Sequence, residues 1–189
     1  PPPGSAPPAC PPAVEEVEAA GAPLRDLTGR ADLPPLILLN ANCSDLLPLR
    51  RWEDARYLEL ARRLLEKYEE VFVGFTGGPA EAPAVIELVR QIGSARCVCL
   101  AGRTTLRQLL VLYGLAEVLV TNDSGPAHFA TLTPFDVVTL FGPETPALLA
   151  PRSPRSHVLG GGLGSPPCGS AYNTGRSACR DNVCMRHIT

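Results

Sequence analysis

An α/β domain with a doubly wound parallel sheet is the fold that this sequence predicts. Five short apolar segments alternate with helical segments between residues 36 and 141. These apolar segments lack a clean alternation of apolar and polar residues, as expected for strands buried on both faces. Strands that alternate with helices form parallel sheets covered by helices on both sides.

The predicted elements follow one another closely along the chain. Strands are expected at residues 36–40, 71–75, 97–100, 118–121 and 137–141, and helices at about 52–69, 80–92, 105–115 and from Pro126 onward. Apolar residues recur at spacings of three and four in the predicted helices. In such sheets ligands bind at the carboxyl ends of the strands. We therefore expect a site among the polar turns at 40–45, 76–78, 102–104, 122–125 and 142–144.

The two ends of the chain differ from this central part. Residues 1–12 contain seven prolines, which favour extended chain. We expect residues 1–35 to be a proline-rich, partly disordered linker, with a short helix over residues 14–20 and a break at Pro23. Residues 36–159 would form the domain, and residues 160–189 a tail containing glycine and cysteine. Because the chain does not begin with Met and has no clear terminating element, we expect it to be a fragment of a longer protein.

Composition excludes several classes of protein. With 189 residues, 45% apolar residues and a formal net charge of −2, the chain fits one globular domain and offers no electrostatic case for binding nucleic acid. No apolar run approaches the roughly 20 residues that span a bilayer, and no signal-peptide pattern is present. The seven cysteines are an odd number, and Cys97 and Cys99 lie in a predicted strand, which disfavours a disulfide framework. We therefore expect a cytoplasmic protein.

The most informative stretch is the junction after the fourth predicted strand. Asp123, Ser124, Gly125 and Pro126 combine a hydroxyl N-cap, a permissive glycine and a proline in the first helical turn. A helix N-terminus of this kind suits a phosphate or pyrophosphate. The Asp123 carboxylate would instead accept hydrogen bonds from sugar hydroxyls. The simpler alternative is that Asp123 and Ser124 only cap a helix.

Other phosphate-binding signatures are missing or misplaced. The chain contains neither G-x-G-x-x-G at the first strand-to-helix turn nor G-x-x-x-x-G-K-[ST], which disfavours a dinucleotide oxidoreductase and a P-loop NTPase. The glycine-rich stretch at 160–164 does not precede a helix, so we expect a flexible loop there.

Five spaced motifs together resemble glycosyltransferase family 9, the group typified by ADP-heptose:lipopolysaccharide heptosyltransferases. The resemblance runs in the correct order from about residue 35 to the C-terminus. Its segments are residues 37–40 with 44–52, 76–79, 100–105, 121–128 and 140–146.

The resemblance implies a GT-B enzyme with two Rossmann-like domains that face each other across a cleft. In this family the N-terminal domain takes the acceptor and supplies the catalytic base, and the C-terminal domain holds the nucleotide sugar. This chain resembles the C-terminal, donor-binding half, so the base is expected in an N-terminal domain that this sequence lacks.

The resemblance also implies a set of nucleotide-sugar-binding residues. Asp123, Ser124 and Gly125 would hold the sugar and the pyrophosphate, and Arg50 would pair with a phosphate unless it is only a solvated cation at a helix start. For Arg103, His128 and Glu144, ordinary structural roles stay open. The complete set is Asp123, Ser124, Gly125, Pro126, His128, Arg50, Gly102, Arg103, Thr104, Gly77 and Glu144.

The implied reaction is an inverting transfer of a sugar, expected to be heptose, from a nucleoside diphosphate sugar, expected to be ADP-linked. The acceptor would be a lipid-linked saccharide of the lipopolysaccharide type, which implies peripheral association with the inner face of the cytoplasmic membrane. No D-x-D pair for a bridging metal ion is present, so no cofactor is expected.

Two other hypotheses stay open. The chain could be a non-catalytic nucleotide- or sugar-binding fragment, because half of a GT-B enzyme lacks its base. It could also be a metal-bearing interaction domain, in which Cys168, Cys179, Cys184 and His187 form a Cys₃His zinc site. The spacing of these residues matches no standard zinc module and favours reduced structural thiols.

Overall fold

A six-stranded parallel sheet in the order β3-β2-β1-β4-β5-β6 forms the centre of the protein. The structure is a computed structural model that describes residues 12–43, 48–160, 179 and 181–189. The strands are β1 (Leu36–Asn40), β2 (Phe72–Phe75), β3 (Cys97–Cys99), β4 (Val118–Asn122), β5 (Asp136–Phe141) and β6 (Ser156–Gly160). The helices are α1 (Val14–Thr28), α2 (Asp54–Lys67), α3 (Ala82–Ile92), α4 (Leu106–Leu115), α5 (Gly125–Ala130), α6 (Pro146–Leu149) and α7 (Val183–Arg186), with 3₁₀ turns η1 (Pro48–Arg50) and η2 (Pro79–Glu81).

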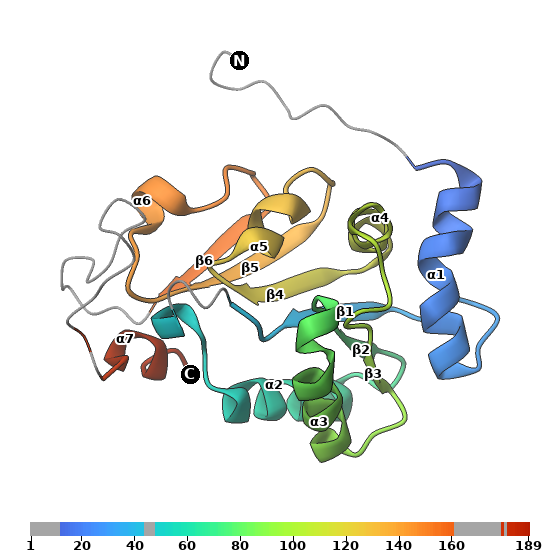
Figure 1. Cartoon of the computed structure of the whole chain (residues 1–189), viewed down its shortest axis with the longest axis horizontal. Helices are drawn as coiled ribbons and strands as arrows, with labels where there is room; N and C mark the ends of the chain where they lie inside the picture. Colours follow the sequence, from blue (N-terminus) through green and yellow to red (C-terminus); the bar gives the residue numbers. More distant parts are fainter. Residues whose placement is uncertain (1–11, 44–47, 161–178, 180) are drawn as a thin grey trace, which may run out of the picture.

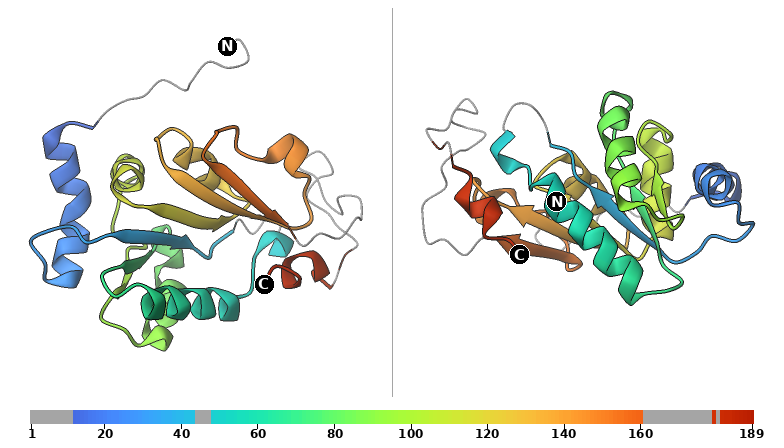
Figure 2. Two further views of the ribbon diagram at one scale, coloured as in Figure 1. Left: turned by 180° about the vertical axis from the view of Figure 1, so that it is seen from behind. Right: turned by 90° about the horizontal axis from the view of Figure 1, so that it is seen from below.

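The predicted fold class is confirmed, because helices cover both faces of the sheet. In Figure 1, α4 and α5 lie above the sheet, whereas α2 and α3 lie below it. The view from behind in Figure 2 shows the same division, with α1 beside α4. The α2–α3 and α4–α5 connections therefore leave the sheet on opposite sides, as in a doubly wound fold.

Successive residues of β1 point into two different hydrophobic cores. Ile37 and Leu39 join the core under α2 and α3, and Leu36 and Leu38 join the core under α1 and α4. All five residues of β1 are buried, because this strand is hydrogen-bonded on both sides, to β2 and to β4. The continuous apolar pattern of the sequence thus reflects a strand with two covered faces.

The expected break at Pro23 is wrong, because α1 continues through it to Thr28. Proline has no N–H to donate to the carbonyl oxygen of Ala19, four residues earlier. The Gln108 side chain of α4 donates to that oxygen instead, at 3.3 Å. Arg107 of the same helix forms a two-pronged ion pair with Glu16, which holds α1 against α4. The proposed domain boundaries themselves stay predictions.

A sixth strand, β6, was not predicted from the sequence. β6 pairs in parallel with β5 in the register Val138 to His157 and Leu140 to Leu159. Four of its five residues are exposed, so its sequence lacks the apolar run that identified the other five strands. Only its pairing with β5 defines it as a strand.

The C-terminal segment packs beneath the β5 end of the sheet. Met185 of α7 is fully buried in the core that contains α2, and the indole nitrogen of Trp52 donates to the carbonyl oxygen of Ile188 at 3.1 Å. α7 lies so close to Gly142, after β5, that a Cβ atom there would be 2.7 Å from Cγ of Met185. Within the part of the chain that the structure describes, no helix has the length and apolar character needed to cross a membrane.

The close approach of α7 to Gly142 leads to a stability prediction. We expect Gly142→Ala to lower the free energy of unfolding by about 1–3 kcal/mol, because the added methyl group overpacks against buried Met185. Gly114→Ala is the matched control, since nothing lies within 4 Å of a Cβ atom there and alanine favours the α4 helix by about 1 kcal/mol. Urea unfolding of both variants measures the difference. Equal stability of the two variants would contradict this packing.

Candidate functional site

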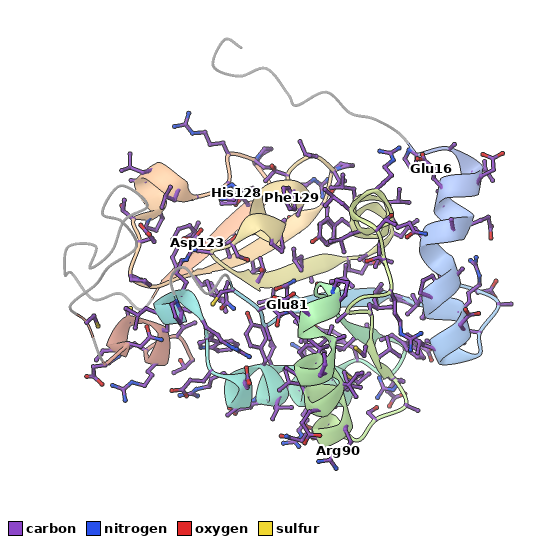
Figure 3. The ribbon with its side chains drawn as sticks, viewed as in Figure 1. Glu16, Glu81, Arg90, Asp123, His128 and Phe129 are labelled. Carbon is purple, nitrogen blue, oxygen red and sulfur yellow. The ribbon has the colours of Figure 1, made fainter. Side chains whose placement is uncertain are left out.

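The candidate site lies where the strand order reverses, between the carboxyl ends of β1 and β4. A pocket of about 260 Å³ opens there. Figure 3 shows Asp123 and His128 near the start of α5 and Glu81 at the top of α3. The pocket is lined by Asn40, Asn42, Cys43, Arg50, Glu81, Asp123, Ser124, Gly125, Pro126 and His128. Ligands of doubly wound sheets bind at this topological position.

The side chain of Asn122, at the end of β4, holds the two halves of the site together. Its amide nitrogen donates to the carbonyl oxygens of Ala41 and Asn42, both at 3.2 Å, and its amide oxygen accepts from the backbone N–H of Trp52 at 2.9 Å. Asn122 is fully buried. It therefore fixes the loop after β1 and the approach to α2 relative to β4.

A second group of buried polar side chains joins the ends of β1 and β2. Asn40 donates to the Thr76 hydroxyl at 3.1 Å, and Asn42 donates to the Thr76 carbonyl oxygen at the same distance. Tyr57 of α2 donates its hydroxyl proton to the Asn40 carbonyl oxygen at 3.0 Å. These bonds satisfy the polar ends of two buried strands.

Arg50 and Asp123 form the charged centre of the pocket. Nη1 of Arg50 lies 3.7 Å from Oδ2 of Asp123, whose side chain is only 3% exposed. Burial raises the pKa of Asp123, and the positive charges of Arg50 and His128 partly oppose this shift. Nε of Arg50 and Oδ2 of Asp123 are buried without a hydrogen-bond partner among the described residues. A ligand that offers both acceptors and donors would satisfy them.

The start of α5 corrects one sequence prediction. The helix begins at Gly125 with Pro126 in its first turn, as predicted. The Ser124 hydroxyl, however, makes no capping bond and donates to the Asn122 carbonyl oxygen at 3.2 Å. The Ser124 hydroxyl therefore lies beside the strand end rather than over the helix. His128 is exposed and lines the pocket one turn later.

Glu144 lies outside the pocket lining, in the turn after β5. Its side chain is buried, and Oε2 has no hydrogen-bond partner in the part of the chain that the structure describes. Burial raises the pKa of Glu144, the negative charge of Asp123 raises it further, and Arg50 lowers it. Glu144 is therefore electrically coupled to the pocket although it does not line it.

The other predicted residues lie along the neighbouring strand ends. Gly77 follows β2, and a Cβ atom there would be 2.7 Å from Nδ2 of Asn42 and 3.1 Å from Oε2 of Glu81, so a larger residue would displace these pocket side chains. Gly102 has a positive φ of 71° and donates to the Gly77 carbonyl oxygen at 2.9 Å. Arg103 is exposed and Thr104 half-buried, and neither lines the pocket.

Comparison with known proteins identifies the family of this chain. The family model of glycosyltransferase family 9 (heptosyltransferase) matches residues 16–175. The chain belongs to glycosyltransferase family 9. Lipopolysaccharide heptosyltransferase 2 of Salmonella typhimurium is 33% identical over 113 residues, which cover 59% of this chain and 32% of the relative. Lipooligosaccharide heptosyltransferase 2 of Haemophilus influenzae is 31% identical over 116 residues, covering 59% of this chain and 33% of the relative.

Solved structures of family 9 proteins have the same fold. The E. coli ADP-heptose lipopolysaccharide heptosyltransferase II superposes with a TM-score of 0.69 at 26% identity, covering 81% of this chain and 45% of that chain. The family 9 glycosyltransferase of Veillonella parvula superposes with a TM-score of 0.70 at 24% identity, covering 82% of this chain and 43% of that chain. The chain thus spans about a third of the curated relatives and less than half of these solved structures.

Four pocket-lining residues of this family 9 chain were not predicted as site residues. Asn40 is the last residue of β1, Asn42 and Cys43 follow that strand, and Glu81 ends η2. Residues 40–45 were expected at the ligand edge and Glu81 in the predicted helix at about 80–92, but no motif distinguished a binding role from a structural one. Glu81 also accepts a bond from the Gly78 N–H at 2.6 Å, so an ordinary turn role explains its presence in the sequence.

The zinc hypothesis stays a prediction for this family 9 chain. Cys168 lies outside the described residues, and the residues that the structure describes contain no group of three or more potential metal ligands. Within them, Sγ of Cys184 lies 3.8 Å from Oδ1 of Asn182, and Nδ1 of His187 lies 2.9 Å from the Val183 carbonyl oxygen.

The Asn122 side chain provides a test of how the site is held together. We expect Asn122→Ala to lower the free energy of unfolding by about 3 kcal/mol, because it leaves two carbonyl oxygens and one N–H buried without partners. Gln91→Ala, on the exposed side of α3, should change it by less than about 0.5 kcal/mol. Chemical denaturation measures the free energy of unfolding of both variants. Equally small decreases in the two variants would mean that the Asn122 side chain is not needed to hold the site together.

The raised pKa of Asp123 predicts a pH-dependent stability difference. The folded chain holds this proton at pH values where the unfolded chain has released it. The resulting stabilisation is present below the unfolded pKa of about 4 and is lost as the pH rises through the folded pKa. We therefore expect Asp123→Asn to gain stability relative to the unsubstituted chain between about pH 4 and pH 7.

Asp136→Asn is the control for this measurement. The pKa of Asp136 is lowered, chiefly by its hydrogen bond with His157 and also by Arg155. The stabilisation from Asp136 is present above its unfolded pKa and lost at lower pH, so this variant should lose stability relative to the unsubstituted chain as the pH rises. The free energy of unfolding, measured at several pH values, gives for each variant the slope of its stability difference from the unsubstituted chain against pH. A slope of the same sign in the two variants would show that our assignment of Asp123 is wrong.

Proposed function

We propose that this chain is the donor-binding half of an inverting heptosyltransferase, which transfers heptose from ADP-heptose to an acceptor of the lipopolysaccharide type. The observation that supports this best is the pocket at the strand-order reversal, where Arg50 and buried Asp123 meet the start of α5. Membership of family 9 gives the class of reaction. The E. coli protein of similar fold is described as an ADP-heptose lipopolysaccharide heptosyltransferase, which favours this donor.

In this proposal the diphosphate lies between Arg50 and the first turn of α5. The guanidinium group donates hydrogen bonds to phosphate oxygens and compensates the charge that develops on the leaving diphosphate. The backbone N–H groups at the start of α5, around Ser124 and Gly125, add a smaller contribution because the helix has only six residues. This chain supplies leaving-group stabilisation without a metal ion.

The carboxylates of the pocket would recognise hydroxyl groups. Asp123 has a buried oxygen without a partner and accepts hydrogen bonds from the donor's sugar. Glu81, on the opposite wall, would accept from the ribose. Gly102 to Thr104 would lie near the base, at the neighbouring strand end.

The remaining parts of the reaction belong to an N-terminal GT-B domain outside this sequence. That domain would supply the catalytic base and most of the surface that meets a lipid-linked acceptor at the inner face of the membrane. Inversion follows from direct attack of the acceptor hydroxyl on the anomeric carbon, opposite the leaving diphosphate.

Titration with nucleoside diphosphates tests the donor pocket. We expect ADP to bind more tightly than UDP or GDP and to shift the backbone amide NMR signals of Ser124, Gly125 and Ala127 and of residues 102–104. Arg50→Gln should weaken ADP binding by about 10- to 100-fold, because a charge-assisted contact to phosphate is lost. Arg51→Gln is the matched control, since Arg51 is exposed and pairs with Asp54 at 2.9 Å.

Three results of this titration would contradict parts of the proposal. Equal affinity for the three nucleotides would remove the ADP assignment. Equal losses in the two arginine variants would remove Arg50 from the site. A folded chain that binds none of the nucleotides would overturn the donor-binding role.

A further inference from the structure

Three charged side chains at the site contain buried polar atoms without hydrogen-bond partners. These atoms are Nε of Arg50, Oδ2 of Asp123 and Oε2 of Glu144. An unpaired buried polar atom destabilises the folded chain, and Asp123 and Glu144 follow the neighbouring strands β4 and β5, so these atoms call for a functional explanation. The donor pocket explains Arg50 and Asp123, which line it, but not Glu144.

Glu144 lies outside the pocket lining, but the charges of two pocket residues act on it. It follows β5 by three residues, and its side chain is only 5% exposed. The charges that act on it are those of Asp123, at the end of β4, and Arg50, in the turn before α2. His128 of α5 acts on Asp123, and Cys184 of α7 lies on the Gly142 side of the same turn.

The charge balance of this group changes when a diphosphate binds. In the free chain, the positive charge of Arg50 compensates two carboxylates. A nucleoside diphosphate sugar adds two negative charges beside Arg50. Arg50, together with His128 and the N–H groups at the start of α5, does not fully compensate four negative charges in a poorly solvated pocket.

We propose that Glu144 is a positioning residue of the donor pocket, which takes up one proton from solvent when a nucleoside diphosphate sugar binds and thereby leaves Arg50 to the diphosphate. The carboxylate of Glu144 becomes a carboxylic acid, and no other bond forms or breaks. This inference depends on the proposed donor-binding function.

Glu144, rather than Asp123, is the group that accepts the proton. Asp123 lies 3.7 Å from Arg50 and also has His128 on its pocket side, so two positive groups favour its ionised form. Among the described residues, Arg50 is the cation that lowers the pKa of Glu144, while the negative charge of Asp123 raises it. When the diphosphate engages Arg50, that compensation weakens and protonation of Glu144 follows.

Calorimetric titration with ADP-heptose tests this proposal. The diphosphate of this probe keeps a constant charge near neutral pH, because both phosphates are esterified. Repeating the titration in buffers of different ionisation enthalpy gives the number of protons taken up. We expect the unsubstituted chain to take up as much as one proton and its affinity to fall by as much as about tenfold per pH unit as the pH rises.

Two variants identify the group that is protonated. Glu144→Gln should bind with little proton uptake and a flat pH profile, and its affinity should exceed that of the unsubstituted chain at high pH. It should be at least as stable in urea as the unsubstituted chain at pH 7, because it removes a buried charge. His128→Asn should keep the proton uptake.

The outcomes separate this inference from the proposed function. If the folded chain does not bind ADP-heptose, the proposed function fails. If it binds without proton uptake, or if Glu144→Gln takes up protons like the unsubstituted chain, the role of Glu144 is wrong. Loss of proton uptake in His128→Asn alone would assign the proton to the histidine and overturn the inference as well.

Discussion

The hydrogen bonds of one buried amide, that of Asn122, determine how the two halves of the site meet. β1 and β4 are neighbours in space but are separated by about eighty residues of chain, and their following loops leave toward opposite faces of the sheet. The Asn122 side chain bonds to the loop after β1 and to the backbone of Trp52 at once. Arg50, which lies just before Trp52, is placed beside Asp123 by the same bonds. Without this connection the two charges of the pocket would belong to independent loops.

The pocket combines hydrogen-bonded polar side chains with buried charged groups that destabilise the folded chain. Polar side chains around it, such as Asn40 and Thr76, are hydrogen-bonded to one another. The ionisable side chains Arg50, Asp123 and Glu144 instead keep buried atoms without partners. A protein tolerates such groups when a ligand satisfies them, because the same desolvation that destabilises the free chain strengthens each contact to the ligand. Stability and binding therefore oppose each other at this site.

The C-terminal segment connects the core to this region. α7 contacts Gly142 at the end of β5, and Ile188 accepts the bond from the Trp52 indole. Trp52 in turn stacks edge-to-face on Tyr57, with ring centroids 5.0 Å apart. The turn that contains Glu144 and the turn that contains Arg50 thus pack against one shared apolar cluster. Changes in the C-terminal segment would reach the pocket through this packing.

The sequence by itself determined the first five strands, the helices between them and the edge at which the ligand turns gather. These features follow from local signals, namely apolar runs in strands such as β1, helical spacing, and the glycine and proline at the start of α5. Arg50, Asp123, Ser124 and His128 were named from their motifs and do line one pocket. The family resemblance, drawn from the same motifs, is confirmed.

Only the tertiary structure decided the rest, because the deciding partners are distant in the chain. Pro23 sits inside α1 since Gln108 replaces the missing bond, and β6 is a strand since β5 pairs with it. The Ser124 hydroxyl turns to the end of β4 instead of capping α5. Likewise, the electrostatic coupling of Glu144 to Asp123 and Arg50 arises from burial and proximity, which no local sequence pattern encodes.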